Sequence, residues 1–184
     1  MVAITDDNIQ KIPKHRYFSD NTNNINDELY NKTIILMTVA QKKANGNETL
    51  LLMRNSDFLY EVTSQHNVAE VSFNQKMLNA LYTNNAETYT AFHNHPDDGP
   101  FSLGDVKQIL EYDKLVLLVL CTNSCKYSAA LYKTNNSKQQ INHILARIMQ
   151  IAFSKNILNM HMDAKKLIKW LVPLGFEYRE YRNY

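Results

Sequence analysis

Cysteine is scarce in this sequence: its 184 residues include two, Cys121 and Cys125. Two cysteines are too few for a disulfide framework in a chain of this length. Their Cys-x3-Cys spacing has no second pair that would complete a zinc site. We therefore expect both to be buried free thiols in a reducing compartment.

Long apolar segments are also missing. Met1 to Lys11 hold acidic and polar groups where a signal peptide requires an apolar core. The longest apolar runs, such as Leu115 to Cys121, are far too short to span a bilayer. We therefore expect a cytoplasmic protein that has no membrane partner.

The sequence has no strong excess of one charge, since its formal net charge is +2. The nearest thing to a basic cluster is Lys165, Lys166 and Lys169, which on a helix is typical of a solvated face. Nucleic-acid binding needs a clustered basic surface, so we expect no nucleic-acid partner. The length and the 45% hydrophobic content are typical of one domain with a substantial core.

The first part of the chain changes from polar to apolar. Residues 1–28 are rich in Asn and Asp without a sustained period, and they predict a flexible arm. Thr33–Val39 is a compact run of branched residues that predicts a buried strand. Gln41–Glu48 contains an Asn-Gly pair and predicts a turn. Thr49–Arg54 and Phe58–Thr63 would complete an antiparallel meander of three strands.

Helices and strands alternate in the middle of the chain. The periodicity predicts a helix over Phe73–Tyr82 capped by Ser72, a strand over Thr88–Phe92, a helix over Leu103–Tyr112, a central strand over Leu115–Cys121 and its neighbour over Tyr127–Tyr132. This order predicts an α/β fold in which helices flank a mixed sheet.

The last residues, 138–184, predict a helical extension that packs on a domain formed by residues 29–137. Lys138–Phe153 has the longest apolar stripe, and a final helix from Asp163 should be stopped by Pro173. That final helix and the Tyr178, Tyr181 and Tyr184 tail are expected to be exposed, and a chain ending at Asn159 to keep a folded core. The C-terminal helices are also candidates for a homo-oligomer contact.

The stretch from Phe92 to Val106, FHNHPDDGPFSLGDV, carries the chemistry. His93 and His95 are two residues apart at the end of a strand, so their imidazoles project to the same side. The following turn and helix would return Asp105 toward them. Two imidazoles and one carboxylate form the open three-ligand site expected of catalytic zinc.

Each part of this stretch has a simpler interpretation on its own. A lone His-x-His is more often surface decoration than a metal site. Ser102-x-x-Asp105 resembles a helix capping arrangement. Their occurrence together, in this order and around a tight turn, favours a metal site, and Asp105 can serve both as cap and as ligand.

The segment resembles the JAB/MPN (JAMM) metalloprotease signature, His-x-His-Pro followed by Ser-x-x-Asp. The His-Asn-His-Pro version is most similar to the bacterial RadC-like branch, and the resemblance covers about residues 33–133. It implies a cytidine-deaminase-like α/β fold, one zinc ion per chain held by His93, His95 and Asp105, and isopeptidase or peptidase activity. The turn from Pro96 to Ser102 is a residue shorter than is usual in the family.

The resemblance also implies a glutamate on an earlier strand that acts as general base. Glu61 is favoured because it lies inside a predicted strand, Glu70 is the alternative, and Glu87 lies too close to the histidines in sequence. A chain without a catalytic glutamate also stays open. Ser102 matches the family's hydrogen-bond donor to the oxyanion.

These features favour a zinc-dependent hydrolase of amide bonds whose substrate is a peptide, a protein tail or a small amide conjugate. One alternative is a catalytically silent binding module with the same fold. Another is a metal-dependent nuclease, suggested by the letters His-Asn-His, although no basic groove is evident. A nucleobase deaminase would need a His-x-Glu and a Pro-Cys-x-x-Cys, and the sequence has neither.

Overall fold

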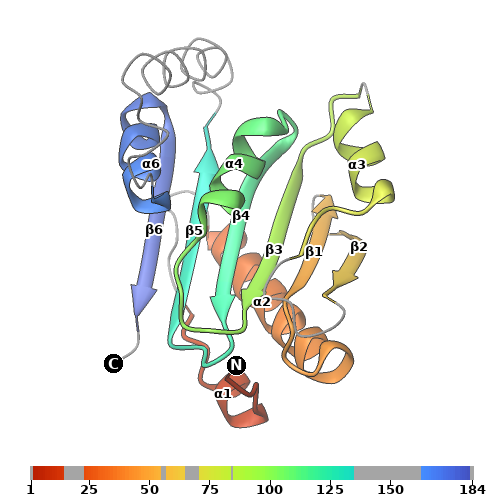
Figure 1. Cartoon of the computed structure of the whole chain (residues 1–184), viewed down its shortest axis with the longest axis vertical. Helices are drawn as coiled ribbons and strands as arrows, with labels where there is room; N and C mark the ends of the chain where they lie inside the picture. The colour runs from red at the N-terminus through yellow and green to blue at the C-terminus, as the bar shows by residue number, and fades with distance from the viewer. Residues whose placement is uncertain are drawn as a thin grey trace.

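A six-stranded mixed sheet runs through the centre of the protein, seen here in a computed structural model (Figure 1). The structure describes residues 2–14, 23–54, 57–64, 71–83, 85–134 and 163–182. In spatial order the strands are β2 (Asp57–Thr63), β1 (Thr49–Arg54), β3 (Tyr89–His95), β4 (Leu115–Thr122), β5 (Tyr127–Lys133) and β6 (Phe176–Arg182). β3 and β4 are parallel, and every other neighbouring pair is antiparallel.

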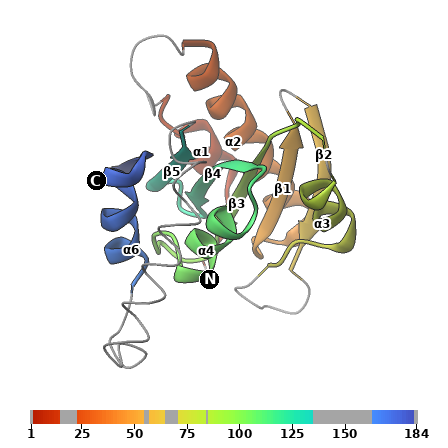
Figure 2. The same ribbon diagram turned by 90° about the horizontal axis from the view of Figure 1, so that it is seen from above.

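Helices cover both faces of this sheet (Figures 1 and 2). α2 (Asn23–Ala44) lies on one face together with the short α1 (Asp6–Gln10). α3 (Gln75–Tyr82), α4 (Leu103–Glu111) and α6 (Ala164–Leu171) contribute to the core on the opposite face. The expected α/β fold with a mixed sheet flanked by helices is therefore confirmed.

Side chains of β3 alternate between the two cores, as the pleat of a strand requires. Ala91 belongs to the core under α4, whereas Phe92 belongs to the core under α2. By the same alternation His93 faces the α4 side and Asn94 faces the α2 side. α4 connects the parallel strands β3 and β4, so its first turn lies beside the end of β3.

Most of the predicted elements between residues 49 and 133 are confirmed, with small shifts of their ends. α3 begins at Gln75 rather than at Phe73, and its cap is Asn74, whose side chain accepts a hydrogen bond from the Met77 amide at 3.0 Å. Ser72 is therefore not the cap. α4 has Ser102 as its N-cap, directly before Leu103.

The predicted strand Thr33–Val39 is wrong, because these residues belong to α2. An apolar run of this length fits a buried helix as well as a buried strand. The burial follows the helical period, since the buried positions include Leu29, Thr33, Leu36, Met37, Ala40 and Ala44. Ile35 points outward and is 42% exposed. The Thr33 hydroxyl donates to the Leu29 carbonyl, as β-branched Thr does inside helices.

The N-terminal residues are folded onto the domain where the structure describes them. Ile4 and Ile12 are buried in the core under α2, on either side of α1. The Val2 amide donates to the Pro96 carbonyl at 2.9 Å, so the chain begins against the His-x-His-Pro segment. The expectation of a loose arm is therefore wrong for residues 2–14 and 23–28.

The C-terminal residues complete the sheet. The predicted helix from Asp163 is confirmed as α6, with Asp163 as its cap and Pro173 in the 3-10 turn that follows. The residues expected to form an exposed tyrosine-rich tail instead form β6, which pairs with β5. Lys138–Phe153 and Tyr184 lie outside the described residues.

α6 is also less exposed than expected. Its buried side chains are Ala164, Leu167, Ile168 and Leu171. Residues 163–182 therefore belong to the same core as the central strands. Within the described ranges, no helix is both long enough and apolar enough to cross a membrane.

A chain that ends at Asn159 should fail to fold, contrary to the expectation from the sequence. It would lose Leu167, Ile168, Leu171 and Phe176, all buried. At about 1.5–3 kcal/mol for each buried apolar side chain, this loss approaches a typical total stability of about 5–15 kcal/mol. Thermal melting followed by circular dichroism would measure it, with deletion of residues 183 and 184 as the control. Cooperative melting of the shorter chain would contradict the expectation.

Candidate metal centre

His93 and His95 place their side chains together at the end of β3. They are two residues apart on an extended strand, so they share the face that α4 covers. Their Nε2 atoms lie 3.2 Å apart, and their ring centroids are 5.0 Å apart. His93 is 2% exposed, whereas His95 is partly exposed. Two imidazole nitrogens therefore converge on one point.

Asp105 reaches the same point from the first turn of α4. Its Oδ1 lies 3.4 Å from Nε2 of His93, and its Oδ2 lies 3.4 Å from Nε2 of His95. The structure thus brings together the three residues that the sequence proposed as ligands. The shortened turn after Pro96 does not prevent Asp105 from reaching the histidines.

A capping box fixes the position of Asp105. The Ser102 backbone N–H donates to Oδ2 of Asp105 at 2.6 Å, and the Asp105 backbone N–H donates to the Ser102 hydroxyl oxygen at 3.1 Å. These reciprocal bonds satisfy amides at the start of α4. Asp105 therefore has both roles that the sequence allowed, as a helix cap and as a neighbour of both histidines.

The turn after β3 orients the His95 ring. Nδ1 of His95 lies 3.2 Å from the Gly99 carbonyl oxygen. A carbonyl can only accept, so Nδ1 carries the hydrogen and Nε2 keeps its lone pair when the ring is neutral. The lone pair then points toward Asp105 and His93. Partners of this kind fix the tautomer of metal-binding histidines.

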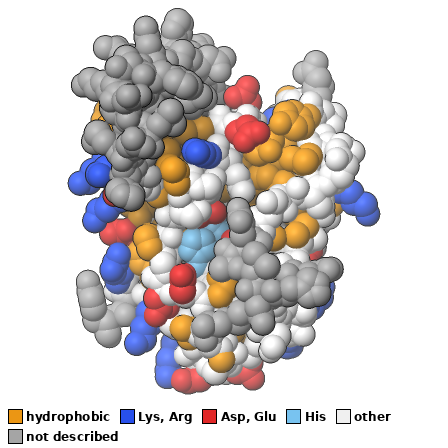
Figure 3. Space-filling model, viewed as in Figure 1, with side chains coloured by type: hydrophobic (Ala, Val, Ile, Leu, Met, Phe, Trp, Pro, Cys, Tyr) orange, Lys and Arg blue, Asp and Glu red, His pale blue; other side chains and the backbone are white. Residues whose placement is uncertain are grey.

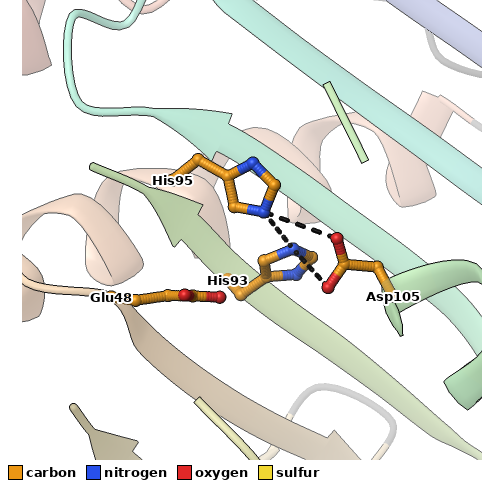
Figure 4. A group of neighbouring side chains, drawn as sticks. All are labelled: Glu48, His93, His95 and Asp105. Carbon is orange, nitrogen blue, oxygen red and sulfur yellow. Dashed lines mark hydrogen bonds and ion pairs between the residues drawn. The ribbon is translucent and has the colours of Figure 1, made fainter. Parts of the chain in front are cut away.

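Glu48 is the fourth member of the cluster and was missed from the sequence. One ligand atom from each of Glu48, His93, His95 and Asp105 lies within 4.8 Å of the others (Figure 4). Glu48 is 4% exposed and immediately precedes β1. In the antiparallel pairing Leu50 lies opposite His93, so stepping back two residues places Glu48 opposite His95. This register follows from the pairing of two segments far apart in the sequence, so no local signal could have identified Glu48.

Glu61, the glutamate favoured from the sequence, lies elsewhere. It is on the edge strand β2, opposite Leu51, and Leu51 lies opposite Phe92 on the α2 side of the sheet. Its carboxylate pairs with Lys43 at 2.8 Å. The structure therefore separates Glu61 from the histidines, and the glutamate beside them is Glu48.

Among the other glutamates considered from the sequence, Glu87 lies away from the cluster. Glu87 pairs with Arg54, which lies opposite Tyr89 at the far end of β3. Glu70 and the remaining histidines lie outside the described residues: His15, His66, His143 and His161. Cys121 and Cys125 are free and buried, as expected.

The electrostatics of the cluster reflect opposed effects. Burial would raise the pKa of Asp105, but the neighbouring His93 charge and hydrogen bonds from both histidines and Ser102 hold it well below its usual range. Burial would lower the pKa of His95, but Asp105 and, to a lesser extent, Glu48 raise it overall. The buried carboxylates of Asp105 and Glu48 therefore favour a positive charge at the cluster.

A pocket opens beside the cluster. Its volume is about 240 Å³, and its walls include Glu48, His95, Ser102 and Asp105. Histidine surface is visible in the middle of the face drawn in Figure 3, with acidic side chains nearby. The Ser102 hydroxyl oxygen accepts the capping hydrogen bond, which leaves its O–H hydrogen unused by the cap. The cluster is therefore accessible to a small group from solvent.

Comparisons of the chain with protein-family models, with curated proteins and with solved structures found no match. What supports the resemblance of the Phe92–Val106 segment to the JAB/MPN signature is therefore the motif itself and the geometry of its residues.

The capping role of Ser102 can be tested without any assumption about function. Ser102→Ala removes the acceptor for the Asp105 amide, so the free energy of unfolding should fall by about 1 kcal/mol. Ser72→Ala is the matched control, because Ser72 lines the same pocket but caps no described helix. Urea denaturation of both variants measures the difference. Equal stability of the two would show that the Ser102 cap contributes nothing.

Proposed function

We propose that this chain is a zinc-dependent hydrolase of amide bonds of the JAB/MPN type. The supporting observation is the convergence of His93, His95, Asp105 and Glu48 beside a pocket. The proposal includes the finer fold assignment, a cytidine-deaminase-like sheet in which the histidine strand is followed by the helix that carries the aspartate.

The donor set of the cluster fits zinc. Imidazole nitrogen and carboxylate oxygen are zinc ligands, and a catalytic site has three protein ligands and one open position. His93, His95 and Asp105 would hold the ion. With neutral imidazoles, the two carboxylates of the cluster carry two negative charges, which a divalent cation would balance.

Each residue of the site has a chemical role in this proposal. A bound zinc ion supplies Lewis acidity, which polarises a carbonyl and lowers the pKa of water toward neutrality. Glu48 takes the proton from the attacking water on one of its Oε atoms and passes it to the leaving amine. The Ser102 hydroxyl donates a hydrogen bond to the carbonyl oxygen of the substrate as negative charge develops there.

The pocket suits an amide group at the end of a flexible chain. At about 240 Å³ it holds a small group rather than a folded partner, and Glu48, Ser102 and Asp105 give it polar walls. The proposed substrate is therefore a peptide, a protein tail or a small amide conjugate.

The protein purified without chelator should contain about one zinc ion per chain. His95→Ala and Asp105→Asn should reduce this to nearly none, because each removes one of three ligands. Glu61→Gln should retain the ion, since Glu61 pairs with Lys43 outside the cluster. Inductively coupled plasma mass spectrometry measures the content, and circular dichroism checks that the variants fold. Unchanged zinc in both ligand variants would refute the assignment.

Glu48→Gln should lower kcat for amide hydrolysis by about 10²–10⁴-fold, the usual contribution of a general base. The measurement uses a panel of fluorogenic peptide and isopeptide amides. Glu61→Gln is the matched control and should keep the activity of the unaltered protein. A loss confined to Glu61→Gln would return the role to Glu61. A zinc-loaded protein that hydrolyses no amide in the panel would indicate a binding module instead.

A further inference from the structure

Two asparagines lie fully buried behind the histidines. Asn94 and Asn123 are each 0% exposed. Asn94 stands between His93 and His95, but its side chain faces the opposite side of β3, toward the start of β1. Asn123 lies in the turn between β4 and β5. Neither was given a role by the sequence motif.

The two amide groups bond to each other and to the segment before β1. Asn94 accepts a hydrogen bond from the Thr49 backbone N–H at 2.8 Å, and its Nδ2 donates to Oδ1 of Asn123 at 2.7 Å. Asn94 also donates to the Asn47 carbonyl at 3.3 Å, and Asn123 donates to the Gly46 carbonyl at 2.7 Å. The carbonyls of Gly46 and Asn47 are thus held directly before Glu48.

Asn123 ties two further segments into the same network. Its Nδ2 also donates to the Val2 carbonyl at 2.8 Å, and its backbone N–H donates to the His95 carbonyl at 2.9 Å. Every donor and the acceptor of each side-chain amide therefore has a partner. A buried network that is fully satisfied holds its members in one arrangement.

The segment that carries Glu48 has an unusual backbone that needs such support. α2 ends at Ala44, and the next two residues have positive φ, 51° for Asn45 and 80° for Gly46. Asn tolerates this left-handed region and glycine enters it without a steric cost. The chain reverses there and enters β1 one residue after Glu48, so the direction of the Glu48 side chain depends on how this turn is held.

We infer that Asn94 and Asn123 are positioning residues that set the Glu48 carboxylate against His93 and His95. The inference rests on the proposed function, because it requires a zinc ion bound beside Glu48. Removing the Asn123 amide frees the carbonyls of Gly46 and Val2 and takes away one acceptor of the Asn94 Nδ2, but it leaves the backbone bond to His95 in place. We expect the loss to reach the zinc site through Glu48, because the Gly46 carbonyl that Asn123 holds lies two residues before it, and the double-mutant cycle below tests this route.

The test is a double-mutant cycle on the full chain with zinc affinity as the readout, measured by competition with a chromophoric chelator. Asn123→Ala should weaken zinc binding by about 10-fold, at the low end of the 10–100-fold effects of outer partners on metal affinity. In a Glu48→Gln background the same change should weaken binding by less than about twofold, because the positioned group is already lost. The visible absorption bands of the Co²⁺-loaded protein should shift by the same amount in Asn123→Ala and in Glu48→Gln. The double variant should show no further shift.

Thr122→Val is the matched control. Thr122 is equally buried, precedes Asn123 and lies opposite His95 in the β3–β4 pairing, but its hydroxyl bonds across the turn to the Tyr127 backbone and not to the segment before Glu48. It should lower the melting temperature while leaving zinc affinity unchanged. If Asn123→Ala does not fold, Asn123→Ser replaces it, because serine keeps one hydrogen-bond donor. Its zinc affinity is then measured with and without Glu48→Gln in the same cycle.

The outcomes separate this inference from the function on which it rests. An equal loss of affinity in the Glu48 and Glu48→Gln backgrounds would overturn the positioning role alone, since zinc would still bind. Absence of zinc from the unaltered protein, including after zinc is added, would overturn the proposed function and this inference with it.

Discussion

The antiparallel pairing of β1 with β3 is the constraint on which the candidate site depends. With Leu50 opposite His93, Glu48 lies opposite His95 and Thr49 lies opposite Asn94. A slip of one residue would turn Glu48 to the other face of the sheet, because side chains alternate along a strand. The apolar residues of β1 oppose such a slip, since Leu50 and Leu51 belong to different cores. The packing of Leu50 and Leu51 in the two cores thus determines that the Glu48 carboxylate reaches the cluster.

Asp105 connects the stability of α4 to the chemistry of the cluster. A carboxylate in the first turn of a helix is favoured by the helix dipole, and here it accepts from the Ser102 amide, which has no partner within the helix. The same carboxylate has both histidine Nε2 atoms within 3.4 Å. A carboxylate held in this way would need little reorganisation to bind a cation, since the cap has already fixed its rotamer. The first turn of α4 therefore positions the Asp105 carboxylate beside the two histidines.

The sequence predicted the part of the site that is local. His93, His95, Ser102 and Asp105 lie within one strand, turn and helix, so spacing and capping preferences were enough to bring them together. Glu48 was missed because its place depends on pairing between distant segments, and because it falls in the predicted Gln41–Glu48 turn rather than on a strand. The strand predicted over Thr33–Val39 is wrong for a different reason. An apolar run of branched residues does not distinguish a strand from a buried helix. Once α2 takes that run, the strand after the Asn-Gly turn becomes the first strand of the sheet.

The position of β6 has a consequence for the order in which the sheet is completed during synthesis. The candidate ligands have all been made once Asp105 is added, yet the sheet that holds them lacks its last strand until Arg182 is made. Tyr178 of β6 lies near Phe101, whose ring lies beside His93, with ring centroids 6.5 Å and 5.8 Å apart. A nascent chain therefore carries two imidazoles and two carboxylates before the strand next to β5 exists. Such an unpaired edge is open to pairing with other chains, and β5 is covered only when synthesis reaches the last strand of the sheet.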